Sequence, residues 1–364
     1  MGESDSTKSD STTISVSTLR SFIEQALCTL DVPEHSATKV ASLMVDADIL
    51  GHDTHGIFRL RQYLARLRDG GCNPDAHITV VKETAATALI DGDNGLGHLA
   101  MSHACELAIA KARDAGIGWV GVRNGNHAGP LALYVRPQAQ QGMIGMAAAV
   151  GSANHVPPFG GTDLLLGTNP VAISAPTADD DPFVLDMAST VAAMGKIKAL
   201  AQRGESMPEG WMVGRDGQPL TDPSRRSEGY MLPIGGPKGF GLSVAMGLMA
   251  GVLNGAAFGS DVVDFTSDTS SPTNTGQFVL ALNVEAFGDL AQFTQSTSAA
   301  FAQMRASQAL PGHDPVRLPG DGKNQSMSQR LQQGVKLGTA LCRDLQALAD
   351  EHGIHSPFKQ SVES

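Results

Sequence analysis

Apolar residues recur at helical spacing through the N-terminal part of the chain. After Ser17 as an N-cap, a first helix is predicted from the apolar positions Leu19, Phe22, Ile23, Ala26, Leu27 and Leu30. Pro33 suits the first turn of a second helix, whose apolar face would be Val40, Leu43, Met44, Ala47 and Leu50. A third helix is predicted from about Ile57 to Asp69, ending at Gly70-Gly71.

The middle of the chain is rich in strand patterns. A hairpin is expected from Ile78 to Asp91, and a helix over about 99–114 leads into the apolar segment GIGWVG. Between Met143 and Asp186, the runs IGMAAAV, VAISAP and FVLDM predict strands separated by Pro and Gly turns. Strands and helices do not alternate regularly, so a doubly wound parallel sheet is not favoured.

Three glycines, Gly116, Gly118 and Gly121, have the GxGxxG spacing of dinucleotide-binding loops. That fingerprint should follow a strand and open a helix, whereas here a helix precedes it and a strand overlaps it. Gly116 is better explained as the C-cap of the preceding helix. The motif therefore does not predict a Rossmann unit.

The C-terminal half returns to helices. The patterns predict a helix near 191–202, a strand over 278–287, and helices over about 291–308 and 329–351. The polar segment from Ser260 to Thr275 is expected to be a mobile surface loop. The apolar run 239–259 approaches the length of a membrane span, but its small residues favour a buried helix that packs through a glycine face.

Composition narrows the class of protein. The 364 residues are 41% hydrophobic, enough for two folded domains, and the net charge of −11 argues against nucleic acid as a partner. Four cysteines, Cys28, Cys72, Cys105 and Cys342, form no CxxC pair, so reduced thiols in a cytoplasmic protein are expected, with no metal site. The polar segment 1–14 is expected to be a disordered tail.

The segment HDTHGIFRLRQY carries candidate chemistry. His55 can exchange a proton at neutral pH if its pKa is near the ordinary value, and Arg59 lies one helical turn later. A planar guanidinium suits a carboxylate, so the pair fits a substrate with a carbonyl or hydroxyl beside a carboxylate. Helix capping with an exposed arginine is an equally good local explanation.

Other candidates lie downstream. Asp186 follows an apolar strand and either caps the next helix or holds a catalytic histidine. His127 lies in a loop after a strand, where ligand-binding and merely solvated histidines both occur. Lys238 stands where the apolar helix begins and favours a phosphate or carboxylate ligand over a solvated lysine. The turn Gly320-Asp321-Gly322 permits close approach of a ligand, but such turns are common.

Several segments together resemble the malate/L-lactate dehydrogenase family, whose members lack a Rossmann domain. These are HDTHGIFRLRQY, GIGWVGVRNGNHAG, PPFGGTDLLLGTNPVAISAP, VLDMASTVAAMGKI, GGPKGFGLSVAMGLMAGVLNGA and VRLPGDG, in family order from about residue 50 to 322. The resemblance implies an α/β fold of the α+β type. A largely antiparallel sheet would bind NAD or NADP, beside a helical domain built from both chain ends, in a homodimer.

The resemblance also implies roles for individual residues. His55 matches the proton donor, with Asp186 as its partner, Thr54 beside it as a pocket hydroxyl, and Arg59 as the ligand of the substrate carboxylate. The residues that match cofactor-binding positions are His127, Phe183, Val184, Leu185, Met187, Ala188, Pro237, Lys238, Gly320 and Asp321.

Two positions depart from the family pattern. Thr54 replaces the usual serine and adds a methyl group to the pocket wall, which bears on substrate size. The ending PGDG replaces a PGE or PGHE type of ending, which shortens or removes a carboxylate and bears on the choice between NAD and NADP.

The sequence therefore predicts an NAD(P)-dependent oxidoreductase that interconverts a 2-hydroxy acid and a 2-oxo acid. One rival is reduction of a cyclic imino acid such as piperideine-2-carboxylate or pyrroline-2-carboxylate; another is a non-catalytic ligand-binding or membrane-associated protein. The expected domains are a helical substrate domain from 15–120 with 310–355, a cofactor domain from 121–309, and tails at 1–14 and 356–364.

Overall fold

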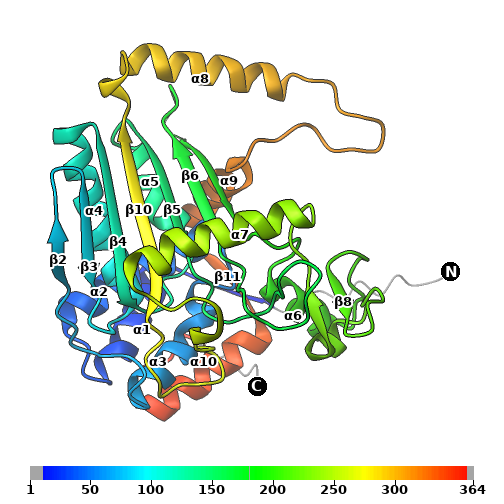
Figure 1. Ribbon diagram of the computed structural model, residues 1–364. Coiled ribbons are helices and arrows are strands. Elements are labelled where there is room, and N and C mark those ends of the chain that lie inside the picture. Colours follow the sequence, from blue (N-terminus) through cyan, green and yellow to red (C-terminus); the bar gives the residue numbers. More distant parts are fainter. Residues whose placement is uncertain (1–10, 180, 359–364) are drawn as a thin grey trace. The chain divides into compact units, whose positions relative to one another are not determined.

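The computed structural model describes residues 11–179 and 181–358 (Figure 1). The chain divides into two compact units. The terminal unit comes from both chain ends, up to Ala65 and from Lys323, and the central unit runs from Arg66 to Gly322. A unit built from both ends was expected, although the predicted boundaries lay near 120 and 310. Residues 1–10 of the predicted N-terminal tail and 359–364 of the predicted C-terminal tail lie outside the described residues.

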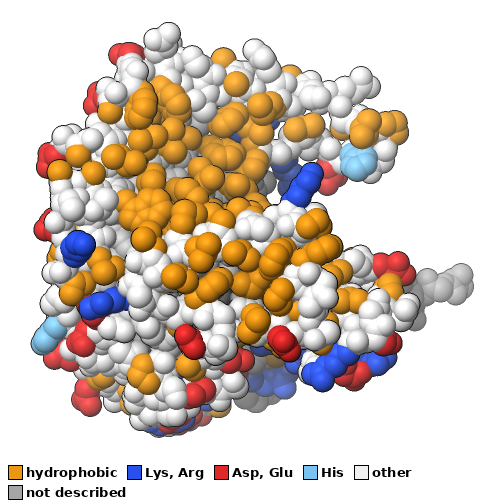
Figure 2. Space-filling model, in the orientation of Figure 1, with side chains coloured by type: hydrophobic (Ala, Val, Ile, Leu, Met, Phe, Trp, Pro, Cys, Tyr) orange, Lys and Arg blue, Asp and Glu red, His pale blue; other side chains and the backbone are white. Residues whose placement is uncertain are grey.

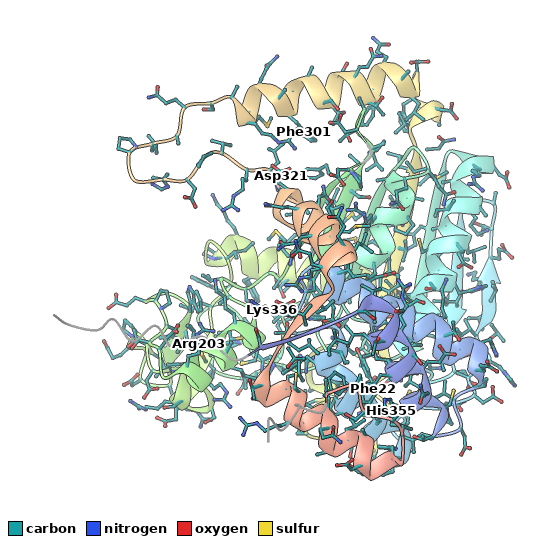
Figure 3. All side chains as sticks on the ribbon, turned by 180° about the vertical axis from the view of Figure 1, so that it is seen from behind. Phe22, Arg203, Phe301, Asp321, Lys336 and His355 are labelled. Atoms are coloured by element: carbon teal, nitrogen blue, oxygen red, sulfur yellow. The ribbon has the colours of Figure 1, made fainter. Side chains whose placement is uncertain are left out.

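The terminal unit is mainly helical. Its elements are β1 (Ser11–Ile14), α1 (Val16–Cys28), α2 (Glu34–Ile49), η1 (Ile57–Arg59), the start of α3 (Leu60–Arg68), most of α9 (Asp321–Gln333), β11 (Val335–Gly338) and α10 (Thr339–His352). Ser15, not Ser17, caps α1 by accepting the Thr18 N–H at 3.1 Å. Phe22 packs edge-on against Phe358, with ring centroids 4.9 Å apart (Figure 3).

Two expectations for this unit are wrong. Residues 11–14 were assigned to a tail but form strand β1, antiparallel to β11, with Ile14 opposite Val335. The single helix expected over 329–351 is interrupted by β11 between α9 and α10. Gly334, between α9 and β11, has φ +88°, and a Cβ there would lie 2.6 Å from the Ile14 carbonyl oxygen. Only glycine has both the backbone freedom and the small size that this turn requires.

The central unit is built on a seven-stranded sheet. The strands, in spatial order, are β2 (Thr79–Glu83), β3 (Thr87–Asp91), β4 (Ile117–Gly125), β10 (Thr275–Asn283), β5 (Met143–Ala149), β6 (Val171–Ala175) and β7 (Phe183–Met187). Only β3 and β4 pair in parallel, across helix α4 (Gly97–Ala115); the other five pairings of this sheet are antiparallel. The expected hairpin over 78–91 is β2–β3, and the mixed α/β class is confirmed.

The three glycines of the GxGxxG spacing have packing roles. Gly116 is the left-handed C-cap of α4, with φ +79°, as expected. A Cβ at Gly118 would lie 2.1 Å from the Ala108 carbonyl oxygen, and one at Gly121 would lie 2.0 Å from Asn254 Oδ1. These glycines allow β4 to pack closely against α4 on one side and against Asn254 on the other.

Helices cover the two faces of the sheet unequally (Figure 1). One face is covered by α4 and α5 (Ala132–Ala139), above buried residues such as Ile90, Val120 and Val279. The other face carries α7 (Pro237–Ala250), which crosses the strands and leaves much of the face open. The apolar run 239–259 was expected to form one buried helix. Instead α7 ends at Ala250, and its outer residue Leu248 is 47% exposed.

Small residues seat α7 on the sheet, as the sequence suggested. Its buried residues are Gly239, Ser243, Met246, Gly247 and Ala250. A Cβ at Gly247 would lie 2.1 Å from the Phe258 ring, so the glycine face is tightly packed. Within the described part of the chain, no helix has both the length and the hydropathy to cross a membrane.

The remaining elements extend the central unit. They are α6 (Met194–Arg203), the hairpin β8 (Met212–Gly214) with β9 (Gly229–Met231), α8 (Leu290–Arg305), and 3-10 turns at Pro223–Glu228, Val252–Asn254, Gly259–Asp261 and Val284–Ala286. The segment 260–275 is not simply a surface loop, because Phe265 and Thr273 on it are buried. The four cysteines are free thiols; Cys72, Cys105 and Cys342 are buried, whereas Cys28 is exposed.

Candidate active site

The turn between α2 and η1 carries the candidate catalytic residues of the terminal unit. Asp48, 2% exposed in α2, accepts the Ile57 N–H at 2.9 Å through its carboxylate. Gly56 lies against that carboxylate so closely that a Cβ would stand 2.0 Å from Asp48 Oδ1. The carboxylate and the glycine together fix where η1 begins, and so fix His55 just before it.

The imidazole of His55 is held by its neighbour. Thr54 Oγ1 and His55 Nδ1 are hydrogen-bonded at 2.9 Å, which orients the ring. Burial, together with the nearby positive charges of Arg59 and Lys323, lowers the pKa of His55 to about 4. A histidine with an ordinary pKa would be partly protonated near pH 7, whereas His55 in this structure is neutral at that pH.

Arg59 ends η1 and is oriented by the same turn. Its Nε–H donates to the Thr54 carbonyl at 2.9 Å, and its guanidinium carbon lies 5.6 Å from the centroid of the Phe58 ring. His55 and Arg59 are both half-buried. The turn thus holds a histidine and an arginine four residues apart, and their roles in proton exchange and carboxylate binding stay predictions.

One face of α9 braces this turn from the other end of the chain. Lys323 Nζ donates to the Gly51 carbonyl at 2.7 Å, and Ser326 donates to the Ile49 carbonyl at 3.1 Å. Arg330 donates to the Asp48 carbonyl at 2.6 Å and pairs with the Asp53 carboxylate. The ion pair gives Asp53 a structural role, and sequence reasoning missed the bracing residues.

Asp186 occupies a different setting from the one its sequence suggested. It lies within β7, which is the predicted strand FVLDM, and its Oδ2 accepts the Ala132 N–H at 2.8 Å, where α5 begins. The next helix, α6, has Ala193 as its N-cap residue. Asp186 therefore caps α5, which precedes it in the chain, and not α6, which follows it. Its partnership with His55 would join residues of the two units and stays a prediction.

His127 follows β4 in the central unit. Its ring stacks on that of Phe265, with centroids 4.8 Å apart and planes 5° from parallel. The Gly129 N–H donates to His127 Nδ1 at 3.3 Å, so the ring proton of the neutral form is on Nε2. Sequence reasoning missed Phe265, which is 138 residues away by numbering (265 − 127).

The other predicted cofactor residues also belong to the central unit. Phe183, Val184, Leu185 and Met187 lie in β7, and Ala188 follows it. Pro237 and Lys238 are the exposed first residues of α7; the two glycines before them, Gly235 and Gly236, have φ +59° and +61°, and no side chain caps the helix.

Gly320 has φ +97°, and a Cβ there would come within 3.0 Å of the Val184 backbone nitrogen. The structure therefore brings these two predicted cofactor residues together. Asp321 is engaged by Arg305, with N–O distances of 2.7 and 3.1 Å, and it accepts the Leu318 N–H (Figure 3 labels Asp321). The hydrogen bonds from Arg305 hold the pKa of Asp321 below its usual value.

Across residues 11–179 and 181–358, no group of three or more His, Cys, Asp or Glu side chains is arranged to hold a metal ion.

The turn therefore holds an imidazole and a guanidinium four residues apart, and the predicted cofactor residues belong to the sheet-based central unit. The family model "Malate/L-lactate dehydrogenase" matches residues 14–346. The chain belongs to this family. The predicted family is confirmed, as is the predicted class, an oxidoreductase that interconverts 2-hydroxy and 2-oxo acids.

Individual relatives match over nearly their whole length. A malate dehydrogenase of Pyrococcus horikoshii is 36% identical over 344 residues, covering 92% of this chain and 94% of the relative. An L-sulfolactate dehydrogenase of Methanothermobacter thermautotrophicus is 36% identical over 340 residues, covering 93% and 97%. A Δ1-pyrroline-2-carboxylate reductase of Ancylobacter novellus is 31% identical over 336 residues, covering 92% and 97%. The crystal structure of malate dehydrogenase from Entamoeba histolytica superimposes with a TM-score of 0.91 at 29% identity, covering 96% of this chain and 100% of that one.

Proposed function

We propose that the protein uses NAD or NADP to interconvert a small 2-hydroxy acid and its 2-oxo acid, with His55 as the acid–base residue. The observation that carries the proposal is the turn that holds His55 and Arg59 four residues apart around Thr54. Arg59 binds the substrate carboxylate through its planar guanidinium. That contact places the neighbouring carbon and oxygen of the substrate within reach of the imidazole.

The resting state of His55 suits the oxidative direction. A histidine with a pKa of about 4 is neutral at pH 7 and can accept the hydroxyl proton of the 2-hydroxy acid. In the free protein, the positive charge of Arg59 lowers the pKa of His55. A bound substrate carboxylate offsets that charge, so substrate binding raises the pKa of His55. The protonated imidazole can then return its proton when a 2-oxo acid is reduced.

The central unit has groups that fit a nicotinamide dinucleotide. Lys238 stands at a helix start without a side-chain cap, which suits a phosphate group. Gly320 packs against the backbone of Val184, which brings two of the predicted cofactor positions together. When bound, the cofactor would exchange a hydride with the substrate carbon. His127, with its Nε2–H, would donate a hydrogen bond toward the nicotinamide end.

Asp186 is proposed to stabilise the imidazolium form of His55, as the family resemblance implies. Asp186→Asn keeps an oxygen that can accept the Ala132 N–H but removes the charge. If the pairing holds, kcat falls by about tenfold or more while the melting temperature changes little, because one lost charge lowers the imidazolium pKa by about one unit. An unchanged kcat would leave Asp186 with its capping role alone.

The coenzyme preference is part of the proposal. Because Arg305 holds both oxygens of Asp321, we propose that this carboxylate does not repel a 2′-phosphate and that NADPH is accepted beside NADH. Steady-state kcat/KM with each coenzyme tests this. A preference for NADH of more than about 10²-fold would contradict it.

Reduction of a cyclic imino acid is the second candidate. It is favoured by the low pKa of His55, since an imine can arrive already protonated and needs no proton from the enzyme. A panel of 2-oxo acids and cyclic imino acids, each with NADH and NADPH, separates the two. Turnover of 2-oxo acids supports the first proposal, and turnover confined to imines replaces it. Binding of NADH without any turnover would support a binding protein.

A homodimer is proposed from the uncovered face of the sheet. Two cross-strand rows of half-exposed apolar side chains lie there in register: Trp119, Leu280, Met146 and Ile173 in one, and Ile117, Leu282 and Ile144 in the other. Figure 2 shows hydrophobic side chains gathered over the strands and α7. A helix that is apolar all round is normally buried, yet Leu248 of α7 is exposed. A second copy of this chain is the proposed cover.

Sedimentation velocity tests the dimer. Sedimentation of the wild type should give a mass of twice the chain mass. Leu248→Asp should shift the measured mass toward that of the monomer, because the variant would bury an unpaired charge in the interface. The matched control is Leu331→Asp, which changes an exposed leucine of α9. A wild-type monomer at micromolar concentration would contradict the proposal. The cytoplasm is the proposed location, since unpaired thiols persist there.

A further inference from the structure

Arg66 is a buried cation that binds backbone carbonyl groups. Although it is 2% exposed, its guanidinium donates to the Asp268 carbonyl at 2.5 Å, the Gly71 carbonyl at 2.6 Å and the Ser271 carbonyl at 2.8 Å. These three hydrogen bonds from the two terminal nitrogens of a buried guanidinium hold the backbone of the segment 268–271 in place. Gly71 adds to the fit, since a Cβ there would lie 2.3 Å from the Thr269 carbonyl oxygen.

The same segment is tied to the residue before His127. Asn126 Oδ1 accepts the Thr273 hydroxyl at 3.0 Å and Arg66 Nη2 at 3.3 Å. Asn126 Nδ2 donates to the Gly95 carbonyl at 2.9 Å. Gln277 Nε2 donates to the Asn126 carbonyl at 3.0 Å. Asn126, 5% exposed, is therefore held through both its side chain and its backbone. Because Asn126 precedes His127 directly, it also fixes the backbone from which the His127 side chain extends.

Phe265 completes the arrangement at the start of this segment. It is 5% exposed, its N–H donates to the Ser152 carbonyl at 3.1 Å, and its ring lies flat on His127. Parallel stacking of two rings restrains both the plane and the position of the imidazole. The position of His127 thus depends on Asn126 through the backbone and on Phe265 through the ring.

We propose that Phe265 is a positioning residue for the nicotinamide end of the cofactor site, acting through His127, and that Arg66 and Asn126 hold the segment 265–273 as a fixed wall of that site. The inference rests on the proposed function for the identity of the ligand. The stack itself is independent of that function.

The test compares two ligands that differ in the nicotinamide. NADH carries it, and ADP-ribose does not. Phe265→Leu should weaken NADH binding by about 3- to 10-fold, in line with the loss of one aromatic pair, while ADP-ribose binding stays within about twofold. Phe265→Tyr keeps the ring and should restore wild-type affinity. Phe287→Leu, the same kind of change at a side chain that is 78% exposed, is the control.

A nuclear magnetic resonance measurement reads the stack directly. The ring proton on His127 Cε1, assigned with His127→Asn, should be shifted by the ring current of Phe265 in the wild type and should move in Phe265→Leu. Thr273→Val removes a hydroxyl bond to Asn126 with little change of shape and should move the same signal by less.

Equal weakening of NADH and ADP-ribose in Phe265→Leu would overturn the proposal, as would an unmoved His127 signal. A wild type that binds neither NADH nor NADPH would end the cofactor proposal instead. In that case a His127 signal that moves in Phe265→Leu would still establish the positioning of the ring.

Discussion

Two histidines with proposed roles, His55 and His127, are held by different kinds of structure. The His55 ring is held by residues close to it in sequence, through Thr54 and the Asp48–Gly56 contact, in a turn whose backbone carbonyls are braced by α9. His127 is fixed by Phe265 and by Asn126, whose partners are spread over about 200 residues from Arg66 to Gln277. The contrast matches the proposed tasks, since the residue that exchanges a proton needs tuned charge and the one beside the cofactor needs a fixed plane.

The electrostatic surroundings of the two histidines also differ. Around His55, burial and the charges of Arg59 and Lys323 keep the imidazole neutral. In the other region the buried charge of Arg66 is held by carbonyl dipoles. Changes near His55 should therefore alter pH dependence and turnover, whereas changes near His127 should alter cofactor affinity.

The largest effect is expected at His55. His55→Ala should reduce turnover by about 10²-fold or more, because the acid–base group is lost, and should leave NADH affinity unchanged. The matched control is His35→Ala, an exposed histidine of α2. Turnover near that of the wild type would refute the assignment.

Arg59→Met should have the second largest effect on activity. Loss of a charged hydrogen-bond pair should raise KM by about 10- to 100-fold with a smaller change in kcat. It should also raise the pKa of His55, because the charge of Arg59 lowers it. Arg68→Met, at an exposed arginine, serves as the comparison. An unchanged KM with a slow chemical step would argue against a carboxylate contact.

Gly56→Ala tests the local character of the turn. The added methyl would clash with the Asp48 carboxylate, so stability should fall by about 1–3 kcal/mol and turnover should fall with it. Gly288→Ala has open space and should change neither. Thermal denaturation and initial rates measure both. A fully active, stable Gly56→Ala protein would show that Asp48 does not fix the turn.

Asp48 gives a smaller, pH-dependent effect. Burial raises the pKa of Asp48 to about 7, so its carboxyl group ionises at a higher pH in the folded state than in the unfolded state. The free energy of unfolding therefore falls as pH rises from about 4 to 7. Asp48→Asn cannot ionise, so its melting temperature relative to the wild type should rise over that range. The ion pair of Arg330 with Asp53 is kept in both proteins. A difference in melting temperature that does not vary with pH would contradict the raised pKa.

The sequence predicted what depends on near neighbours. The helices near the N-terminus, the hairpin over 78–91, the C-cap at Gly116 and the His55–Arg59 spacing all follow from local periodicity and capping. The family came from six short motifs in order. These features need no knowledge of the distant chain.

The errors concern long-range contacts. Strand β1 exists because β11 pairs with it, which four polar and β-branched residues do not reveal by themselves. The segment 260–275 looked like a mobile loop because its anchor, Arg66, is distant in sequence. The pKa of His55 could not be read from its motif, since burial and Lys323 set it.

His55, with its lowered pKa, is the group that we propose exchanges the proton of the reaction. The most direct test is the pH profile of kcat/KM for oxidation of an accepted 2-hydroxy acid, which reports the free enzyme. The folded pKa lies below the ordinary value of 6.5, so the imidazole stays neutral on acidification until about pH 4. The profile should therefore be flat from pH 7 to 5 and fall only near pH 4. A tenfold loss per pH unit beginning near 6.5 would contradict the account.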